Sequence, residues 1–315
     1  MSIQTTSLAE HTVRGAPARA DGERSRRRTR LHLPGSKKST ILTIAMWTCA
    51  AYFLVPLIWL VISTSKSDGG LFSTFGLVPG TFSQLIKNVE TVFTTNGGEF
   101  GIWLLNTAFY GITSAFGAVA LATLAGYALA KYRFAGDRLI FSVILGAVMI
   151  PGTALAIPTY LLFAHIGLTN TAWAIILPSI VNPFGVFLMR IYAAEAVDDS
   201  LIEAARVDGA GEFRIFWTVS LRLLSPAIVT VFLFALVATW NNYLLPLIML
   251  NNSSLFSITV GLSEWLAASN NAGGTRIAIS TLITGAFISI IPLIVAFLTL
   301  QRYWQSGLST GSVKG

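Results

Sequence analysis

Residues 200–226 read SLIEAARVDGAGEFRIFWTVSLRLLSP, a charge-rich segment set between two long apolar stretches. Residues 166–189 precede it and residues 223–263 overlap its end, and neither stretch contains an Asp, Glu, Lys, Arg or His. A helix of about 20 apolar residues is enough to cross the ~30 Å hydrocarbon core of a bilayer. The alternation therefore predicts a hydrophilic loop between two membrane-spanning helices.

The composition of the whole chain supports a membrane protein. Of its 315 residues 54% are hydrophobic and only 11% are charged, whereas soluble domains carry about 25% charged residues. We predict an all-α polytopic fold: a basic, mostly disordered tail over 1–40, a transmembrane domain over 41–305 and a short tail over 306–315. The charge-poor stretches predict about six spans, roughly at 41–63, 103–130, 139–164, 171–190, 223–250 and 278–300.

The positions of the basic residues predict the orientation, because cytoplasmic segments collect Lys and Arg. With the N-terminus inside, 18 of the 21 basic residues are cytoplasmic, and only Lys66, Lys87 and Arg276 lie outside. Both termini and the loop 191–222 are therefore predicted to be cytoplasmic. The Arg-rich tail immediately before the first span fits attraction to anionic membrane lipid better than nucleic-acid binding.

The loop itself has the chemistry of a helix–turn–helix. Ser200 and Glu203 are spaced as a capping box, in which each side chain satisfies an amide of the first helical turn. Gly209 and Gly211 favour the end of that helix, since glycine adopts left-handed geometry at little cost. A second helix is expected to begin near Glu212.

The same loop resembles the coupling loop of permease subunits in binding-protein-dependent ABC importers. In that family Glu-Ala-Ala is followed by three residues, Gly, nine residues and Ile-x-Leu-Pro. The last position departs from the pattern, because Arg222 stands where proline is usual. We therefore expect the second loop helix to run on toward Pro226, with Arg222 either at the membrane boundary or paired with the ATPase. The resemblance implies that the ATPase-coupling residues are Glu203, Ala204, Ala205, Asp208, Gly209 and Arg222, although local chemistry alone allows Glu203 to be a helix cap only.

The resemblance extends over roughly 41–305. Residues 126–134 (GYALAKYRF), 157–160 (IPTY), 184–190 (FGVFLMR) and 240–247 (WNNYLLPL) are similar to the six-span partner in permeases of the maltose-type carbohydrate uptake group. This implies a subunit of the prokaryotic plasma (inner) membrane that forms part of the route for a sugar or oligosaccharide. The implied partners are a second permease subunit, two cytoplasmic ABC ATPase subunits and an extracytoplasmic solute-binding protein.

The sequence lacks the residues that other functional classes require. It has no Gly-x-x-x-x-Gly-Lys-Ser/Thr phosphate loop, so ATP would be hydrolysed by a separate ATPase, and we expect no catalytic residue, no metal and no directly bound cofactor. The spans contain no Asp or Glu, which argues against a membrane-embedded protease and against an ion-coupled secondary transporter. The alternatives are a permease of the same architecture for a non-sugar solute and an ATP-independent secondary transporter.

Two patterns inside the spans are candidates for the solute pathway and for helix packing. Polar and aromatic groups at membrane depth mark either a pathway or hydrogen bonds between helices; the candidates are Trp240, Asn241, Asn242, Tyr243 and Asn182. Small residues at four-residue spacing predict a close helix contact within the subunit or with a partner; these are Ser114, Ala118, Ala122, Gly126 and Ala130.

Overall fold

The computed structural model describes residues 39–270 and 277–310, and side chains as far as residue 303. The predicted tail over 1–40 lies almost entirely outside the described residues, as does the end of the predicted tail over 306–315. The contacts divide the chain between residues 51 and 52. The packing described below is that of the larger unit, from residue 52 onward.

The described residues form helices and connecting turns and contain no strand, which confirms the all-α prediction. In chain order they are α1 (Thr40–Ser63), α2 (Asp68–Ser73), α3 (Phe82–Thr94), η1 (Thr95–Gly97), α4 (Glu99–Lys131), α5 (Asp137–Val148), α6 (Ala156–His165), α7 (Trp173–Ile180), α8 (Pro183–Ala196), α9 (Asp199–Val207), α10 (Glu212–Ile215), η2 (Phe216–Ser220), α11 (Leu221–Leu223), α12 (Ser225–Trp240), α13 (Leu244–Met249), η3 (Ser253–Leu255), α14 (Ile258–Asn270) and α15 (Ile279–Thr310).

Four apolar segments of the described chain are long enough to cross a membrane, and α10–α11 with α12 make a bent fifth. The predicted span over 139–164 differs, because it is not one continuous helix. It consists of α5 and α6, with 12 and 10 residues, separated by turns over 149–155. Pro151 and Gly152 lie in this break, where proline removes an amide donor and glycine raises the entropic cost of a helix.

A second break in the helices lies between Pro178 and Pro183. Helix α7 ends at Ile180 and α8 begins at Pro183. Asn182 caps α8, since its Oδ1 accepts the Gly185 amide at 2.8 Å. Proline at the first helical position needs no amide partner, which makes it a natural start for α8.

Helix α4 is the centre of the packing and contacts α7, α8 and α12. The small-residue ridge faces these neighbours: Ser114, Ala118 and Ala122 are fully buried. At Gly126 an added Cβ would lie 2.7 Å from the Cβ of Met189 in α8. The ridge is therefore a packing surface within the subunit, which is one of the two roles that the spacing predicted.

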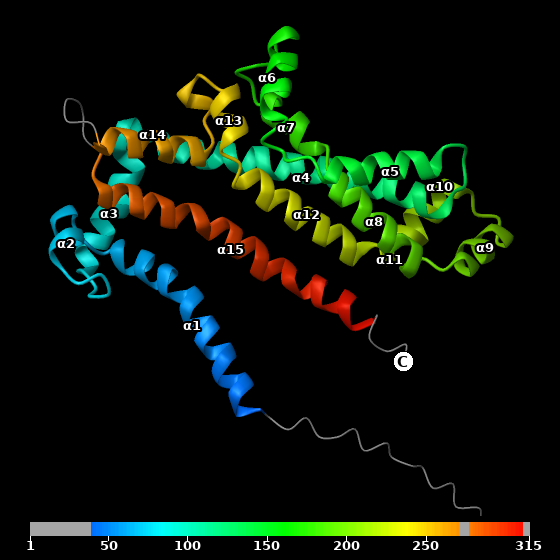
Figure 1. The fold of residues 1–315 in the computed structure, drawn as a ribbon, viewed down its shortest axis with the longest axis horizontal. Helices are drawn as coiled ribbons and strands as arrows, with labels where there is room; N and C mark the ends of the chain where they lie inside the picture. Colours follow the sequence, from blue (N-terminus) through cyan, green and yellow to red (C-terminus); the bar gives the residue numbers. More distant parts are fainter. Residues whose placement is uncertain (1–38, 271–276, 311–315) are drawn as a thin grey trace, which may run out of the picture. The chain divides into compact units, whose positions relative to one another are not determined.

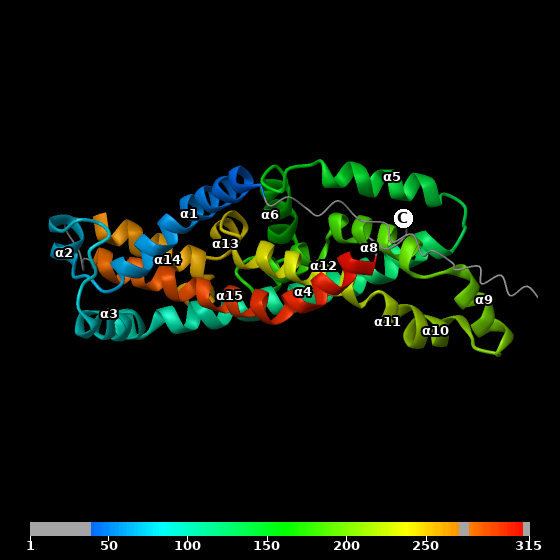
Figure 2. The same cartoon turned by 90° about the horizontal axis from the view of Figure 1, so that it is seen from below.

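Helix α12 lies between α4 and α15 and packs against both (Figure 1). Both views place α9 and α10 at one end of these helices and α2, α3 and α14 at the other (Figure 2). The charge-rich loop is thus held away from the turns that join the other ends of the helices.

Candidate functional site

The segment 198–223 forms the predicted helix–turn–helix, with one correction at its start. Asp198, rather than Ser200, is the N-cap of α9, because its Oδ1 accepts the Ser200 amide at 2.9 Å. The capping box with Glu203 is therefore wrong, because the helix begins at Asp199, two residues earlier than the Ser–Glu spacing requires. Gly209 follows α9 with φ +80°, which confirms the glycine turn, and α10 begins at Glu212 as expected.

The second half of the loop continues past Arg222 before it breaks. After α10 the chain widens into the π-helical turn η2 and then forms α11, which includes the exposed Arg222. Leu224 ends α11, and α12 starts at Ser225 with a bend of 75° between the two parts. The structure thus agrees with a helix that runs through Arg222 toward Pro226, whereas the sequence did not indicate η2.

One face of the loop is fastened to the bundle by apolar packing. Ile202 of α9 and Ile215 of α10 are buried in one cluster with Met189 of α8. Phe216 joins this cluster, and its ring centroid lies 5.0 Å from that of Tyr127 in α4. Burial of such side chains stabilises the contact by about 1.5–3 kcal/mol each.

The opposite face of the loop exposes large apolar side chains. Val207 is 88% exposed and Phe213 is 77% exposed. The Phe213 ring meets the half-exposed Trp217 edge to face, with centroids 5.9 Å apart. Exposed apolar groups gathered at one place mark a contact surface for another protein or a membrane.

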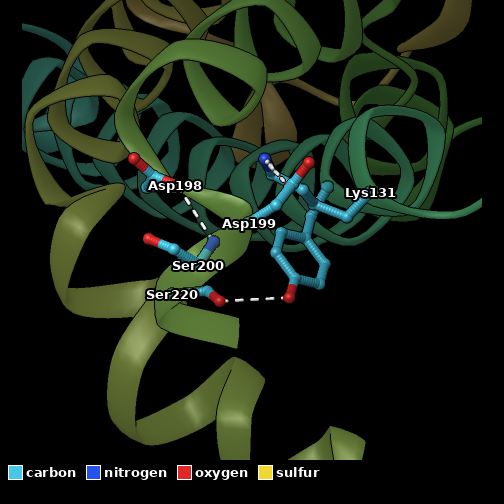
Figure 3. A network of polar contacts seen from close by, with 6 residues as sticks. Lys131, Asp198, Asp199, Ser200 and Ser220 are labelled. Carbon is cyan, nitrogen blue, oxygen red and sulfur yellow. Dashed lines mark hydrogen bonds and ion pairs between the residues drawn. The ribbon is translucent and has the colours of Figure 1, made fainter. Parts of the chain in front are cut away.

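Polar contacts also tie the loop to the end of α4 (Figure 3). The Lys131 ammonium lies 2.7 Å from Asp199 Oδ1, and Ser220 Oγ donates to the Tyr127 hydroxyl at 3.1 Å. Tyr132, the residue after α4, donates its hydroxyl to Glu212 Oε2 at 2.7 Å. The loop therefore has three polar connections to α4 and its C-cap, at 127, 131 and 132.

Glu212 receives a second hydrogen bond from within the loop. Arg206 Nε lies 2.6 Å from Glu212 Oε1. This bond, and then the one from Tyr132, lowers the pKa of Glu212 below its usual value. Burial and the bond to Glu212 raise the pKa of Tyr132, so its phenol keeps the proton that it donates.

The predicted coupling residues lie on the outer side of this arrangement. Glu203, Ala204 and Asp208 are exposed, and Ala205 is half-buried against the apolar cluster. Within the described chain the carboxylates of Glu203 and Asp208 make no hydrogen bond or ion pair. They are therefore available to a separate protein.

A cavity of about 1090 Å³ lies between α5, α6, α7, α8, α12 and α13. Its wall includes the chain breaks at 150–155, 181–182 and 241–243. The described lining contains no Asp, Glu, Lys, Arg or His. Its polar side chains are Thr153, Thr159, Ser179, Asn182, Thr239, Asn241, Asn242 and Tyr243.

Four of the five predicted pathway residues line this cavity, and Trp240 does not. The indole N–H of Trp240 donates to the Ser289 carbonyl of α15 at 3.1 Å, so this side chain joins two helices. Asn241 is exposed, and among the described residues its side chain donates only to the Val237 carbonyl of its own helix. Tyr243 shares a 3.0 Å hydrogen bond with Ser263 of α14.

Residues 118–309 match the family described as the binding-protein-dependent transport system inner membrane component. The chain belongs to this family. It is therefore a membrane-spanning permease of the ABC importer class, as the coupling-loop resemblance predicted. The matched range includes the loop and the lining of the cavity.

The permease is similar to two transport proteins over most of its length. It is 31% identical over 280 residues to the arabinooligosaccharides transport system permease protein AraQ of Halalkalibacterium halodurans, covering 88% of this chain and 97% of that protein. It is 29% identical over 288 residues to the lactose transport system permease protein LacG of Rhizobium radiobacter, covering 90% and 98%.

The fold is also that of a solved transporter. A chain in the crystal structure of a bacterial ABC transporter involved in the import of the acidic polysaccharide alginate superposes with a TM-score of 0.74. The match covers 84% of this permease and 95% of that chain at 23% sequence identity. The likeness supports the arrangement of helices described above.

Proposed function

We propose that this permease forms part of the membrane route for a neutral sugar or oligosaccharide, which an extracytoplasmic binding protein delivers. The observation that carries the proposal is the 1090 Å³ cavity, whose described lining offers hydroxyl and amide groups and no charge. Such groups exchange hydrogen bonds with sugar hydroxyls, and the adjacent apolar surface suits the faces of sugar rings. The names of AraQ and LacG refer to uncharged saccharides, which supports the same substrate class.

The energy for transport would come from two separate ATPase subunits that dock on the loop 198–223. The exposed Val207 and Phe213 supply an apolar contact surface, and the unpaired Glu203 and Asp208 supply charge at its edge. Interfaces commonly combine an apolar centre with a charged rim. A second permease subunit would complete the route on the side of the cavity that this chain leaves open.

Reconstitution into proteoliposomes tests this function. The permease is combined with its partner permease, ATPase pair and binding protein, and uptake of radiolabelled arabino-oligosaccharides and lactose is compared with uptake of an acidic oligosaccharide. We expect uptake of a neutral saccharide that requires ATP and every other subunit. Uptake without the ATPase, or uptake of the acidic compound alone, would contradict the proposal.

The orientation is proposed from the charge asymmetry, with the loop and both termini in the cytoplasm. A Ser200→Cys variant in a Cys49→Ala background places a single thiol on the exposed surface of α9. A membrane-impermeant maleimide should label it in inverted vesicles and not in intact cells. Labelling from outside would show that the loop faces away from the cytoplasm, where a cytoplasmic ATPase could not dock on it.

A further inference from the structure

Besides its apolar packing on α8, the coupling loop has two further attachments to the bundle, and they differ in stiffness. Toward α12 the chain passes through the π-helical η2 and a 75° bend at Leu224. The N-cap of α12, Leu224, makes no side-chain capping hydrogen bond at this bend. Interrupted helices of this kind are where chains bend, so this attachment transmits displacement poorly.

Toward α4, besides the contacts at Tyr127 and Lys131, two side chains meet at one carboxylate. Tyr132 reaches Glu212 from the C-cap of α4, while Arg206 reaches it from the last turn of α9. Glu212 is itself the first residue of α10. One carboxylate therefore joins α4, α9 and α10 through two hydrogen bonds of 2.7 and 2.6 Å, and bonds to a charged acceptor are the strong ones. We call Tyr132, Arg206 and Glu212 the clamp.

Helix α4 is suited to carry a displacement away from the loop. It is 33 residues long and has no internal proline. It does not line the cavity, but it packs against α7, α8 and α12, each of which does. Close packing without voids transmits displacement between helices.

We propose that the clamp makes the two loop helices and the end of α4 move as one body. The proposal rests on the docking of ATPases at the loop. Their motion reaches the cavity walls through α4, while the bend at Leu224 lets α12 change its angle to the loop. The residues of the clamp are positioning residues. They determine how much of the displacement caused by the ATPases is transmitted to the walls of the cavity.

Coupling, measured as solute transported per ATP hydrolysed, tests this role in the complete reconstituted transporter. Tyr132→Phe keeps the ring and removes the hydroxyl, and Glu212→Gln removes the charge. We expect each to lower the coupling ratio by about fivefold, the factor that corresponds to one net hydrogen bond, with the ATPase still bound. Arg133→Gln is the matched control, because its 3.7 Å ion pair joins it only to the nearby Asp137.

A covalent link between positions 132 and 212 tests whether the clamp acts in coupling or only stabilises the loop. Tyr132→Cys with Glu212→Cys in a Cys49→Ala background leaves two thiols, which a short bis-methanethiosulfonate linker can join. We expect the unlinked double variant to be uncoupled and the linked one to recover its coupling ratio. Loss of transport on linking would overturn the proposal, because it would mean that the loop must separate from α4.

Unchanged coupling in both Tyr132→Phe and Glu212→Gln would also overturn it. Failure of the underlying function looks different. In that case the unmodified transporter takes up solute without its ATPase, whatever the state of the clamp.

Discussion

The Lys131 ammonium lies 2.7 Å from the Asp199 carboxylate, which joins the last residue of α4 to the first residue of α9 although they are 68 positions apart. The pair is asymmetric, because the Lys131 side chain is 6% exposed and that of Asp199 is 79% exposed. It also suits both helices, since a cation at the C-terminus of α4 and an anion at the N-terminus of α9 oppose the helix dipoles.

Lys131→Met keeps the buried stem and removes this ion pair. We expect hydrogen exchange of the α9 amides to become roughly two- to fivefold faster, as the loss of a partly exposed pair allows. Hydrogen–deuterium exchange of the purified permease measures this. Arg138→Met is the control, because the exposed Arg138 makes no ion pair within the described residues. Equal exchange of α9 in both variants would show that Lys131 does not hold the loop.

Gly126→Ala tests the contact between α4 and α8. The new methyl group would lie 2.7 Å from the Cβ of Met189 and 2.8 Å from the Arg190 amide nitrogen. Because a backbone atom must move, we expect a loss of about 1–3 kcal/mol, which thermal unfolding in detergent detects. Gly146→Ala in α5, where nothing lies within 4 Å, should be neutral or stabilising. A neutral Gly126→Ala variant would mean that the two backbones are less close.

Gly209→Val tests the turn between the loop helices. Gly209 has φ +80° with open space around it, so the cost is one of backbone conformation and not of contact. We expect a loss of at least about 1–2 kcal/mol in loop stability and a fall in ATP-driven uptake, with normal membrane insertion. The control is Gly211→Val, because Gly211 has φ −74° and equally open surroundings. Similar uptake in the two variants would exclude a role for the left-handed turn.

The depressed pKa of Glu212 predicts an acid-sensitive loop. The Arg206 bond, followed by the Tyr132 bond, holds this pKa below the usual 4.5. Stabilisation is therefore complete above the unfolded pKa and is lost as the pH falls through the folded value. We expect protection of α9 and α10 from hydrogen exchange to be constant down to about pH 5 and to decline below it, after correction for intrinsic exchange. Glu212→Gln should lack this decline, and an identical profile in that variant would assign it to other carboxylates.

Asn241→Leu tests the cavity as part of the solute route. The side chain lines the cavity, and within the described part of the chain its only hydrogen bond is to the Val237 carbonyl of its own helix. Its replacement should raise the KM for uptake about five- to tenfold, the effect of losing one hydrogen bond to solute, with the fold unchanged. Asn270→Leu removes the same type of bond, to the Leu266 carbonyl, at the end of α14 and outside the cavity lining. Equal kinetics for the two variants would place the route elsewhere.

The sequence alone determined the features that depend on local composition and spacing. Absence of charge located the apolar segments, because burial in a bilayer depends on each stretch by itself. Glycine at 209 located the turn between α9 and α10, because left-handed geometry is a backbone preference of this single residue. The four-residue spacing of small side chains likewise indicated the packed face of α4.

Only the tertiary structure decided which distant residues meet. The clamp brings Tyr132 to Glu212 across 80 positions of the chain, and nothing in the spacing of those residues indicates their contact. The cavity likewise assembles from breaks near 152, 182 and 242, whose shared location depends on how α4 packs its neighbours. Local preferences fix where a helix starts or bends, but relative placement is a sum of many weak packing contacts along the whole chain, and no single segment encodes it.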